Sequence, residues 1–397
     1  MKTLSFALGL VVISAALTQA ATKYVITNDD NEYPNINSAS IYSIGPNYTL
    51  NLVTTIQTGG YGQGGGYYPI SRVNVLRSKT QNCAYIGDAL GPNDKRPGDV
   101  ASIDMNSLKL VGTYPANAFD SGALWGIGLA ENPAGTFLFA GYSQSGTIAT
   151  YAQGEDCVLT YKSEVVAIGL NVGSVDGMKV TPNGKYLVVT YNDSSIGSYS
   201  INSKTGALTL IGRSLVGDNG LAAGVDISAD GKWAVFGVDT IFSGAEVEVA
   251  PINANGTIGA TVGYTPIGSG SNGATAWLSP DETLVYIANN NSGQVTAVPF
   301  NATTGVINAN AACTSPVLKN FNTTWQAMGS VTTSTLKNLG SPLLAGEWSY
   351  TNLGGIAIVD VSTKNGACKL LESPASPVAD PVSDFLMTVG VDPPRPF

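Results

Sequence analysis

The chain has 397 residues, of which 44% are hydrophobic and only 12% charged, and it contains 47 Gly and 20 Pro. This composition excludes a disordered chain and favours many short strands joined by tight turns. The formal net charge is −9, so nucleic acid is a poor partner, because binding it needs clustered Lys and Arg. The lack of basic runs also argues against binding to an anionic membrane surface.

Residues 1–20 have the pattern of a secretory signal. Lys2 supplies the positive start, residues 6–17 form an apolar stretch, and Thr18-Gln19-Ala20 is a small-residue cleavage site. The apolar stretch is too short for a membrane span, and no longer one follows. We therefore expect a secreted protein, extracellular or cell-wall associated. Its mature chain, residues 21–397, is expected to form a single monomeric domain without a membrane span.

Strands are expected from the start of the mature chain. The N-terminal stretch predicts three of them, at Lys23–Thr27, Ala39–Ile44 and Tyr48–Ile56. Six units follow, each predicted to contain four short strands, at 72–114, 126–160, 177–211, 224–259, 273–307 and 325–372. The clearest unit reads GMKVTPNGKYLVVTYNDSSIGSYSINSKTGALTLI. Four short strands separated by turn residues make one antiparallel sheet.

The units recur at a nearly constant spacing. Their anchor residues Phe137, Tyr186, Trp233 and Leu284 lie 49, 47 and 51 residues apart. A period near this length, with four strands per unit, is typical of a β-propeller, in which each sheet hides its faces against its neighbours.

The two chain ends complete the predicted ring. Residues Asp384–Val391 look like a first strand and can supply the strand that the N-terminal three lack. The sequence therefore predicts an all-β fold: a seven-bladed β-propeller of four-stranded antiparallel blades. The ring would be closed by the C-terminal strand pairing with the N-terminal blade, which leaves no exposed inner edge.

Cysteines and sequons fit a secreted chain. Four cysteines allow three pairings, and we favour Cys83–Cys157 and Cys313–Cys368, since each pair would link neighbouring blades. Their spacing fits no zinc motif, and we expect neither a metal nor a cofactor. Six Asn-X-Ser/Thr sequons predict surface glycosylation, at Asn47, Asn192, Asn255, Asn290, Asn301 and Asn322.

The repeat resembles the lactonase-type seven-bladed propellers, which include 6-phosphogluconolactonase-like proteins and the fungal carboxymuconate cyclases. The resemblance is clearest at Pro182–Leu210, Ser228–Val235 and Ser279–Thr304. It implies lactone opening or closing on small carboxylated substrates, which in the lactonizing members depends on a histidine and arginines. Secreted fungal relatives are known as cell-surface glycoproteins.

This chain departs from that pattern because it contains no histidine and only five arginines. We therefore carry over no catalytic residue. The missing histidine also excludes Ser-His-Asp and Cys-His arrangements and histidine-based metal sites. A general base near neutral pH would have to be a carboxylate with a raised pKa, a Lys with a lowered pKa, or a Tyr.

Sites in propellers usually lie at one mouth of the axial channel. The repeat register places six first-strand starts there, at Arg72, Trp125, Asp176, Asn272, Gln326 and Asp384. Loops between second and third strands would add Asp29, Asp88, Tyr142, Asn192, Asp239, Asn289 and Glu347.

Two interpretations of this mouth stay open. In the first, Arg72 pairs a substrate carboxylate, Asp176 or Glu347 is the base, and the ligand is held by Trp125, Tyr142, Asn272, Gln326 and Asp384. In the second, Asp176 and Asp384 bond strand-start backbone amides, and Arg72 pairs with one of them.

Two further stretches contain residues that a ligand-binding or metal-binding site could use. Residues 59–68, GGYGQGGGYY, lack the Lys-Ser/Thr and the helix of a phosphate-binding loop, and we interpret them as a linker near the mouth. Tyr61, Tyr67 and Tyr68 could stack on a ligand there. Asn28–Glu32 does not match calcium-loop spacing and is interpreted as an acidic surface loop.

Two functions remain in competition. The first is a non-catalytic secreted glycoprotein that binds a small molecule, a glycan or host matrix. The second is a lactonase or carboxymuconate-type cyclising isomerase that acts on small carboxylated lactones without a histidine. A sugar-binding propeller enzyme is a third, more distant reading.

Overall fold

The computed structural model describes residues 24–46, 49–62, 74–91, 98–116, 127–143, 145–216, 220–240, 244–266, 272–290, 292–318, 327–333, 343–349, 353–364, 367–376, 378–379 and 388–391. Across these ranges the chain is built from strands and two short 3₁₀ helices, η4 (Glu155–Cys157) and η5 (Ala309–Ala311). The predicted signal at 1–20 lies outside the described residues.

The described strands form seven antiparallel sheets, named here sheet 1 to sheet 7. Sheet 1 consists of β1 (Tyr24–Asn28), β2 (Ser38–Ile44), β3 (Leu50–Gln57) and β30 (Thr388–Val391). Sheet 2 consists of β4 (Val75–Arg77), β5 (Cys83–Asp88), β6 (Asp99–Asp104) and β7 (Lys109–Pro115). Sheet 3 consists of β8 (Ile127–Glu131), β9 (Phe137–Tyr142), β10 (Thr147–Gln153) and β11 (Leu159–Val166). Sheet 4 consists of β12 (Val175–Val180), β13 (Tyr186–Tyr191), β14 (Ser195–Ile201) and β15 (Leu208–Leu215).

The remaining sheets include two that exceed the predicted four strands. Sheet 5 consists of β16 (Leu221–Ile227), β17 (Trp233–Thr240), β18 (Gly244–Pro251) and β19 (Gly263–Pro266). Sheet 6 contains β20 (Asn272–Leu278), β21 (Leu284–Asn290), β22 (Gln294–Asn301), β23 (Val306–Ile307) and β24 (Cys313–Thr314). Sheet 7 contains β25 (Ala327–Thr333), β26 (Leu343–Ser349), β27 (Leu353–Lys364), β28 (Ala367–Glu372) and β29 (Val378–Ala379). In sheets 6 and 7 a short fifth strand pairs with the third strand beside the fourth.

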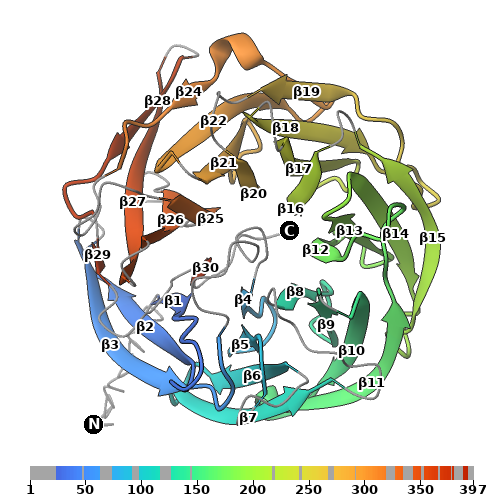
Figure 1. Cartoon of the computed structure of the whole chain (residues 1–397), viewed down its shortest axis with the longest axis vertical. Coiled ribbons are helices and arrows are strands. Elements are labelled where there is room, and N and C mark those ends of the chain that lie inside the picture. Colours follow the sequence, from blue (N-terminus) through green and yellow to red (C-terminus); the bar gives the residue numbers. More distant parts are fainter. Residues whose placement is uncertain are drawn as a thin grey trace, which may run out of the picture.

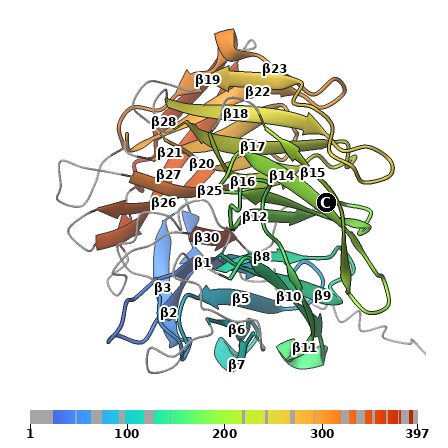
Figure 2. The same ribbon diagram turned by 45° about the vertical axis from the view of Figure 1, so that its right-hand side comes forward.

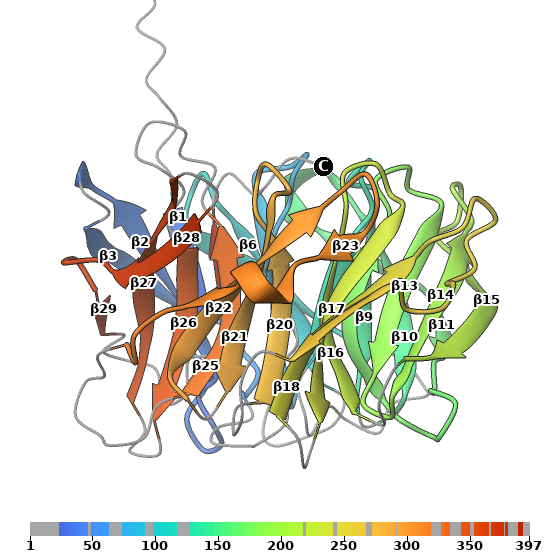
Figure 3. The ribbon, with the colours of Figure 1, turned by 90° about the horizontal axis from the view of Figure 1, so that it is seen from above.

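The sheets stand around a common axis, with β30 of sheet 1 and the first strands of sheets 2 to 7 innermost (Figure 1). Seen from the side, the strands run between the two faces of a disc (Figure 3). Loops between second and third strands lie at one face, which we call the mouth face. The opposite face, which we call the turn face, carries the turns that join first to second strands and third to fourth strands. The predicted β-propeller architecture is confirmed.

The two chain ends share sheet 1. Strand β30 pairs antiparallel with β1, in a register that sets Val25 opposite Val391 and Asn28 opposite Thr388. The two strands lie side by side in both Figure 1 and Figure 2. The pairing lies where the sequence placed it, although the described strand begins at Thr388 rather than at Asp384.

Alternating side chains of each strand point to opposite faces of its sheet, so every sheet has two apolar faces to bury. Seven core clusters among the described residues fill the spaces between neighbouring sheets. One of them packs Val25 and Tyr42 of sheet 1 against Ile356 and Ile358 of sheet 7. Contacts therefore run from each sheet to the next and from the last back to the first.

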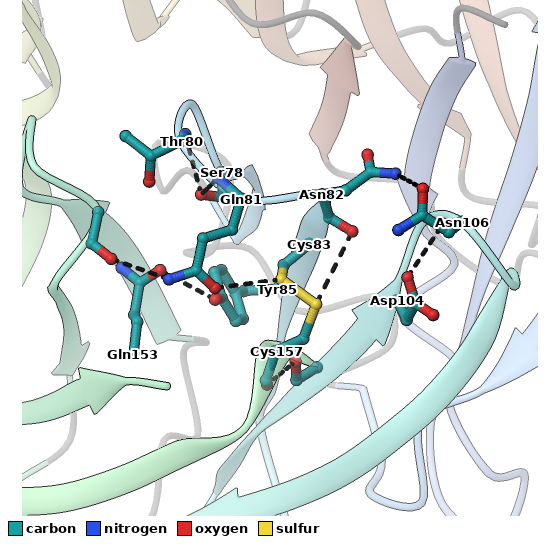
Figure 4. The surroundings of a disulfide bond; sticks show 12 residues. Ser78, Thr80, Gln81, Asn82, Cys83, Tyr85, Asp104, Asn106, Gln153 and Cys157 are labelled. Atoms are coloured by element: carbon teal, nitrogen blue, oxygen red, sulfur yellow. Dashed lines mark hydrogen bonds between the residues drawn. A yellow bond between two sulfur atoms is a disulfide. The ribbon is translucent and has the colours of Figure 1, made fainter. Parts of the chain in front are cut away.

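Two disulfides reinforce these junctions and confirm the favoured pairings. Cys83 of β5 is bonded to Cys157 of η4, which joins sheets 2 and 3. Beside it, the Tyr85 hydroxyl donates to Gln153 Oε1 at 2.9 Å across the same junction (Figure 4). Cys313 of β24 is bonded to Cys368 of β28, which joins sheets 6 and 7.

A glycine turn on the turn face covers the anchor aromatic of the preceding sheet. Gly206 lies against Phe137, Gly256 against Tyr186, and Gly305 against Trp233. Each glycine has a positive φ, and a Cβ at any of the three would come within 2.5–2.6 Å of the ring. These turns therefore require glycine, and they fix the register between adjacent sheets.

Candidate functional site

A buried network of carboxylates and amides joins sheets 1 and 2 at the mouth face. Asp88 ends β5 and Asp99 begins β6, and the antiparallel register sets them directly opposite one another. Their side chains are 0% and 2% exposed. From sheet 1, Asn37 Nδ2 donates to Asp88 Oδ1 at 2.6 Å, and Thr58 Oγ1 donates to the same oxygen at 2.9 Å. We call this group the carboxylate network.

The network continues into the end of β1. Asn37 Nδ2 also donates to Asn28 Oδ1 at 2.8 Å, and Asn28 Nδ2 donates to the Gly87 carbonyl of β5 at 3.0 Å. One asparagine thus bridges a carboxylate of sheet 2 and an amide of sheet 1. These side chains link sheets 1 and 2 at the point where the backbone hydrogen bonds within each sheet end.

Burial controls the protonation of the two acids. Desolvation raises the pKa of both, and the pKa of Asp99 rises further because the neighbouring Asp88 charge opposes its ionisation. Hydrogen bonds from Asn37 and Thr58 act in the opposite direction on Asp88. These effects favour the protonated form of Asp99 at neutral pH, beside the carboxyl group of Asp88.

The start of the glycine-rich stretch closes over this pair. A Cβ on Gly60 would lie 2.7 Å from Asp88 Oδ2, and one on Gly62 would lie 2.1 Å from the carbonyl carbon of Asp30. Tyr61 is buried, and its ring meets that of Tyr33 edge-on at 5.3 Å. Residues 59–62 therefore form a close-fitting cover, and Tyr61 packs against the protein instead of presenting its ring to a ligand.

The expectation of an acidic surface loop at Asn28–Glu32 is wrong, because the first four of these residues are buried. Asp29 receives hydrogen bonds from Thr27 Oγ1 at 2.6 Å, from Ser38 Oγ at 2.6 Å and from Ser40 Oγ at 3.0 Å. Its carboxylate organises the end of β1 and the start of β2. Across the described ranges, no three acidic or cysteine side chains gather as a metal site would require.

Tyr142 differs from its predicted role as a ligand contact. Its side chain is fully buried in the core between sheets 2 and 3, and its hydroxyl lies 2.9 Å from that of Tyr151. Burial raises its pKa well above the ordinary tyrosine value. The same arrangement recurs one sheet on, where the hydroxyls of Tyr191 and Tyr199 are 2.8 Å apart. The ring therefore belongs to the packing between sheets.

The structure describes three other residues that the sequence predicted at the mouth. Asp176 is 6% exposed on β12, beside a bulge between Val175 and Met178. Asn192 Oδ1 accepts a bond from the Ser174 amide at 2.8 Å. Asn289 is buried and donates to Thr296 Oγ1 at 2.8 Å, while its own Oδ1 has no partner among the described residues.

Several predicted residues lie outside the described part of the chain. Asn272, Glu347 and Asp239 belong to β20, β26 and β17, but their side chains fall outside it. The remaining ones fall outside it entirely: Arg72, Trp125, Gln326 and Asp384, together with Tyr67 and Tyr68.

The bulge beside Asp176 is a repeated feature of the innermost strands. Equivalent bulges occur at Ala222/Val225 in β16, Gly273/Ala276 in β20 and Met328/Ser330 in β25. Bulges turn side chains and often lie beside functional sites. Four consecutive sheets therefore present irregular backbone at the same level near the axis.

A second polar link crosses three innermost strands. Lys179 Nζ of β12 lies 3.1 Å from Asp226 Oδ1 of β16, and 4.7 Å from the ring centroid of Trp277 on β20. Asp226 Oδ2 also accepts a bond from the Leu278 amide at 3.0 Å. Sequence reasoning missed this link, and it missed Asn37, Thr58 and Asp99. The signal for Lys179, Asp226 and Trp277 was their equivalent position in successive repeats.

No family model matches the chain, and no curated protein sequence matches it. Several solved structures share its fold. A 6-phosphogluconolactonase-like protein from Bacteroides fragilis has a TM-score of 0.71 at 14% identity, covering 94% of this chain and 99% of that one. The periplasmic gluconolactonase of Pseudomonas aeruginosa has a TM-score of 0.67 at 13% identity, with 93% and 99% coverage. A Lactobacillus plantarum protein has a TM-score of 0.71 at 14% identity, again with 93% and 99% coverage. The chain therefore has a lactonase-like propeller fold.

In the part of the chain that the structure covers, no helix has the length and apolar character of a membrane span.

Proposed function

We propose that this protein is a secreted, single-domain, seven-bladed lactonase-like propeller that binds a small molecule or a glycan at its mouth face without catalysing its turnover. Each of the seven sheets would be one blade, and β30 would close the ring. The observation that carries the non-catalytic assignment is the burial of three described mouth-face carboxyl groups, those of Asp29, Asp88 and Asp99.

These three acids show this burial most clearly. Asp29 is held by hydroxyls of its own sheet, and Asp88 Oδ1 is held by Asn37 and Thr58. Asp99 lies opposite Asp88 and is 2% exposed. A general base has to reach a water molecule or a substrate proton within hydrogen-bond distance. Asp88, which Gly60 covers, and Asp99 are 0% and 2% exposed and do not offer that contact, although the raised pKa of Asp88 would otherwise suit a base.

Secretion is supported by two features of the chain. The predicted signal at 1–20 would direct export, and the two disulfides are typical of proteins that mature in an oxidising compartment. A related fold occurs in the periplasmic gluconolactonase of Pseudomonas aeruginosa. We propose an extracellular or cell-wall location.

The ligand class follows from the same comparison and from the side chains near the mouth. The predicted ligand-binding amides Asn272 and Gln326 are suited to sugar hydroxyls, and the named neighbours include a gluconolactonase. A small polyhydroxylated ligand, either a sugar lactone or a glycan end, therefore fits best.

The alternative function is lactone hydrolysis, and the structural neighbours favour it over carboxymuconate-type cyclisation. Three of them are covered almost completely by this chain, and one is named a gluconolactonase. In that case Arg72 would orient the substrate and a mouth carboxylate would activate water.

One pair of measurements separates the two functions. Hydrolysis of glucono-1,5-lactone is followed in a pH-stat, and binding of the lactone and of gluconate is followed by calorimetry. The proposal predicts saturable binding with only the spontaneous rate of ring opening. A rate above that background, which falls to it in Arg72→Ala, would replace the proposal with the lactonase alternative.

A further inference from the structure

Two of the six sequons lie in exposed turns of the turn face. Asn255 belongs to the connection between β18 and β19, in the sequence Asn-Gly-Thr. Asn301 ends β22 before the turn into β23, in the sequence Asn-Ala-Thr. Both asparagines are exposed, and they lie on neighbouring sheets 5 and 6.

Each asparagine uses its oxygen inside its own turn. Asn255 Oδ1 accepts bonds from the Thr257 amide at 3.1 Å and from the Thr257 hydroxyl at 2.8 Å. Asn301 Oδ1 accepts bonds from the amides of Thr303 at 2.9 Å and Thr304 at 3.2 Å. Neither Nδ2 atom donates a hydrogen bond to any described residue. The nitrogen that would carry a sugar is therefore left on the solvent side.

The turns are anchored by groups other than these asparagines. Tyr186 donates its hydroxyl proton to the Ala254 carbonyl at 2.9 Å, and the Trp233 indole N–H donates to the Ala302 carbonyl at 2.8 Å. The backbone thus fixes each turn to the preceding sheet, so a bulky group on the asparagine displaces no packing contact.

Asn192 offers a contrast on the mouth face. It is half-buried, and its loop is tied to the neighbouring connection by bonds between Asn192 Oδ1 and the Ser174 amide and between the Asn192 amide and the Ser174 carbonyl. Asp193 Oδ2 also accepts the Asn171 and Gly173 amides at 2.7 and 2.8 Å. A glycan at Asn192 would have to fit against this tied loop.

We propose that Asn255 and Asn301 carry N-linked glycans and that Asn192 does not, so that the turn face of sheets 5 and 6 is sugar-coated. Nδ2 would lose a proton and form a bond to C1 of an N-acetylglucosamine. The bond between that C1 and the diphosphate of a lipid-linked oligosaccharide would break, and the lipid diphosphate would leave. The carboxylate network lies on the opposite face, so the mouth would stay open. This inference rests on the secretion assigned above.

The test is glycopeptide mass spectrometry on the full chain secreted from a eukaryotic host, with and without peptide N-glycosidase treatment. We expect sugar on the peptides that contain Asn255 and Asn301, and none on Asn192. Asn255→Gln and Asn301→Gln should each remove one glycan and leave the other. Thr257→Ser and Thr303→Ser keep the sequons and should keep both glycans.

Two outcomes overturn different statements. A secreted chain that is unmodified at Asn255 or Asn301, or modified at Asn192, contradicts this inference alone. A folded chain that stays inside the cell without any glycan contradicts the proposed secretion.

Discussion

At the residue scale, the carboxylate network shows how an acidic chain uses its charges inside the fold. Asp88 and Asp99 face each other across two strands, burial raises the pKa of both, and Asn37 and Thr58 donate hydrogen bonds to Asp88. A buried carboxyl pair of this kind costs stability when both groups ionise. The network therefore couples folding to pH.

Asp99→Asn should stabilise the protein at neutral pH. The pKa of Asp99 is higher in the folded state than in the unfolded chain. As pH rises, Asp99 therefore loses its proton in the unfolded chain before it does so in the folded protein. The contribution of Asp99 to the free energy of unfolding is complete below about pH 4. This contribution is lost as pH rises, by up to roughly 1.4 kcal/mol per pH unit. Urea unfolding between pH 4 and 8 should show the variant gaining on wild type as pH increases. A difference that does not change with pH would refute the raised pKa of Asp99 in the folded protein.

Asp104→Asn is the matched control on the same strand. Hydrogen bonds from Ser107 and Asn106 lower the pKa of Asp104. Its contribution is present above the unfolded pKa and disappears as pH falls through the folded one. This variant should therefore lose stability at neutral pH and match wild type in acid, which is the opposite trend.

Residue roles were harder to predict from the sequence than residue positions. The register placed Asp29, Asp88 and Tyr142 correctly at the ends of second strands. The register gave no information on the partners of these side chains. Asn37 lies 51 residues from Asp88 in the sequence, and the Tyr142 hydroxyl meets that of Tyr151 only because β9 pairs with β10. Alternation along a strand does not say whether the last side chain turns to the core or to the mouth.

At the element scale, the repeat predicted most strands because alternating apolar residues and Gly-containing turns are local signals. The unit at 177–211 folds as four strands, as expected. The short fifth strands β24 and β29 were missed because each contains two residues and depends on pairing with a distant strand. The glycine turns over Phe137, Tyr186 and Trp233 likewise exist only in the assembled sheets.

Gly305→Ala should destabilise the protein by roughly 1–3 kcal/mol. Gly305 has a φ of +73°, and a Cβ there would lie 2.5 Å from the Trp233 ring. Gly212→Ala is the control, since its φ is not positive and its Cβ would meet nothing within 4 Å. Urea unfolding of the two variants should separate them. Equal stabilities would show that the turn does not need glycine.

At the scale of the whole molecule, strands from the two ends of the chain pair in one sheet. Core clusters run between successive sheets, and the cluster between Val25 and Ile356 links the first and last sheets. Two disulfides reinforce the junctions of sheets 2 with 3 and 6 with 7, whereas β30 joins sheet 1 through its pairing with β1 and has no disulfide among the described residues. The pairing of β30 with β1 was predictable because three N-terminal strands need a fourth and only the C-terminal stretch was left to supply it.

Hydrogen–deuterium exchange of residues 24–28, in the full chain and in a chain ending at Met387, tests the closed ring most directly. We expect slow exchange of β1 amides in the full chain, and fast exchange with a lower unfolding midpoint in the shortened chain, because removal of β30 leaves the inner edge of β1 unpaired. Equal protection of residues 24–28 and an unchanged midpoint in both chains would contradict the ring.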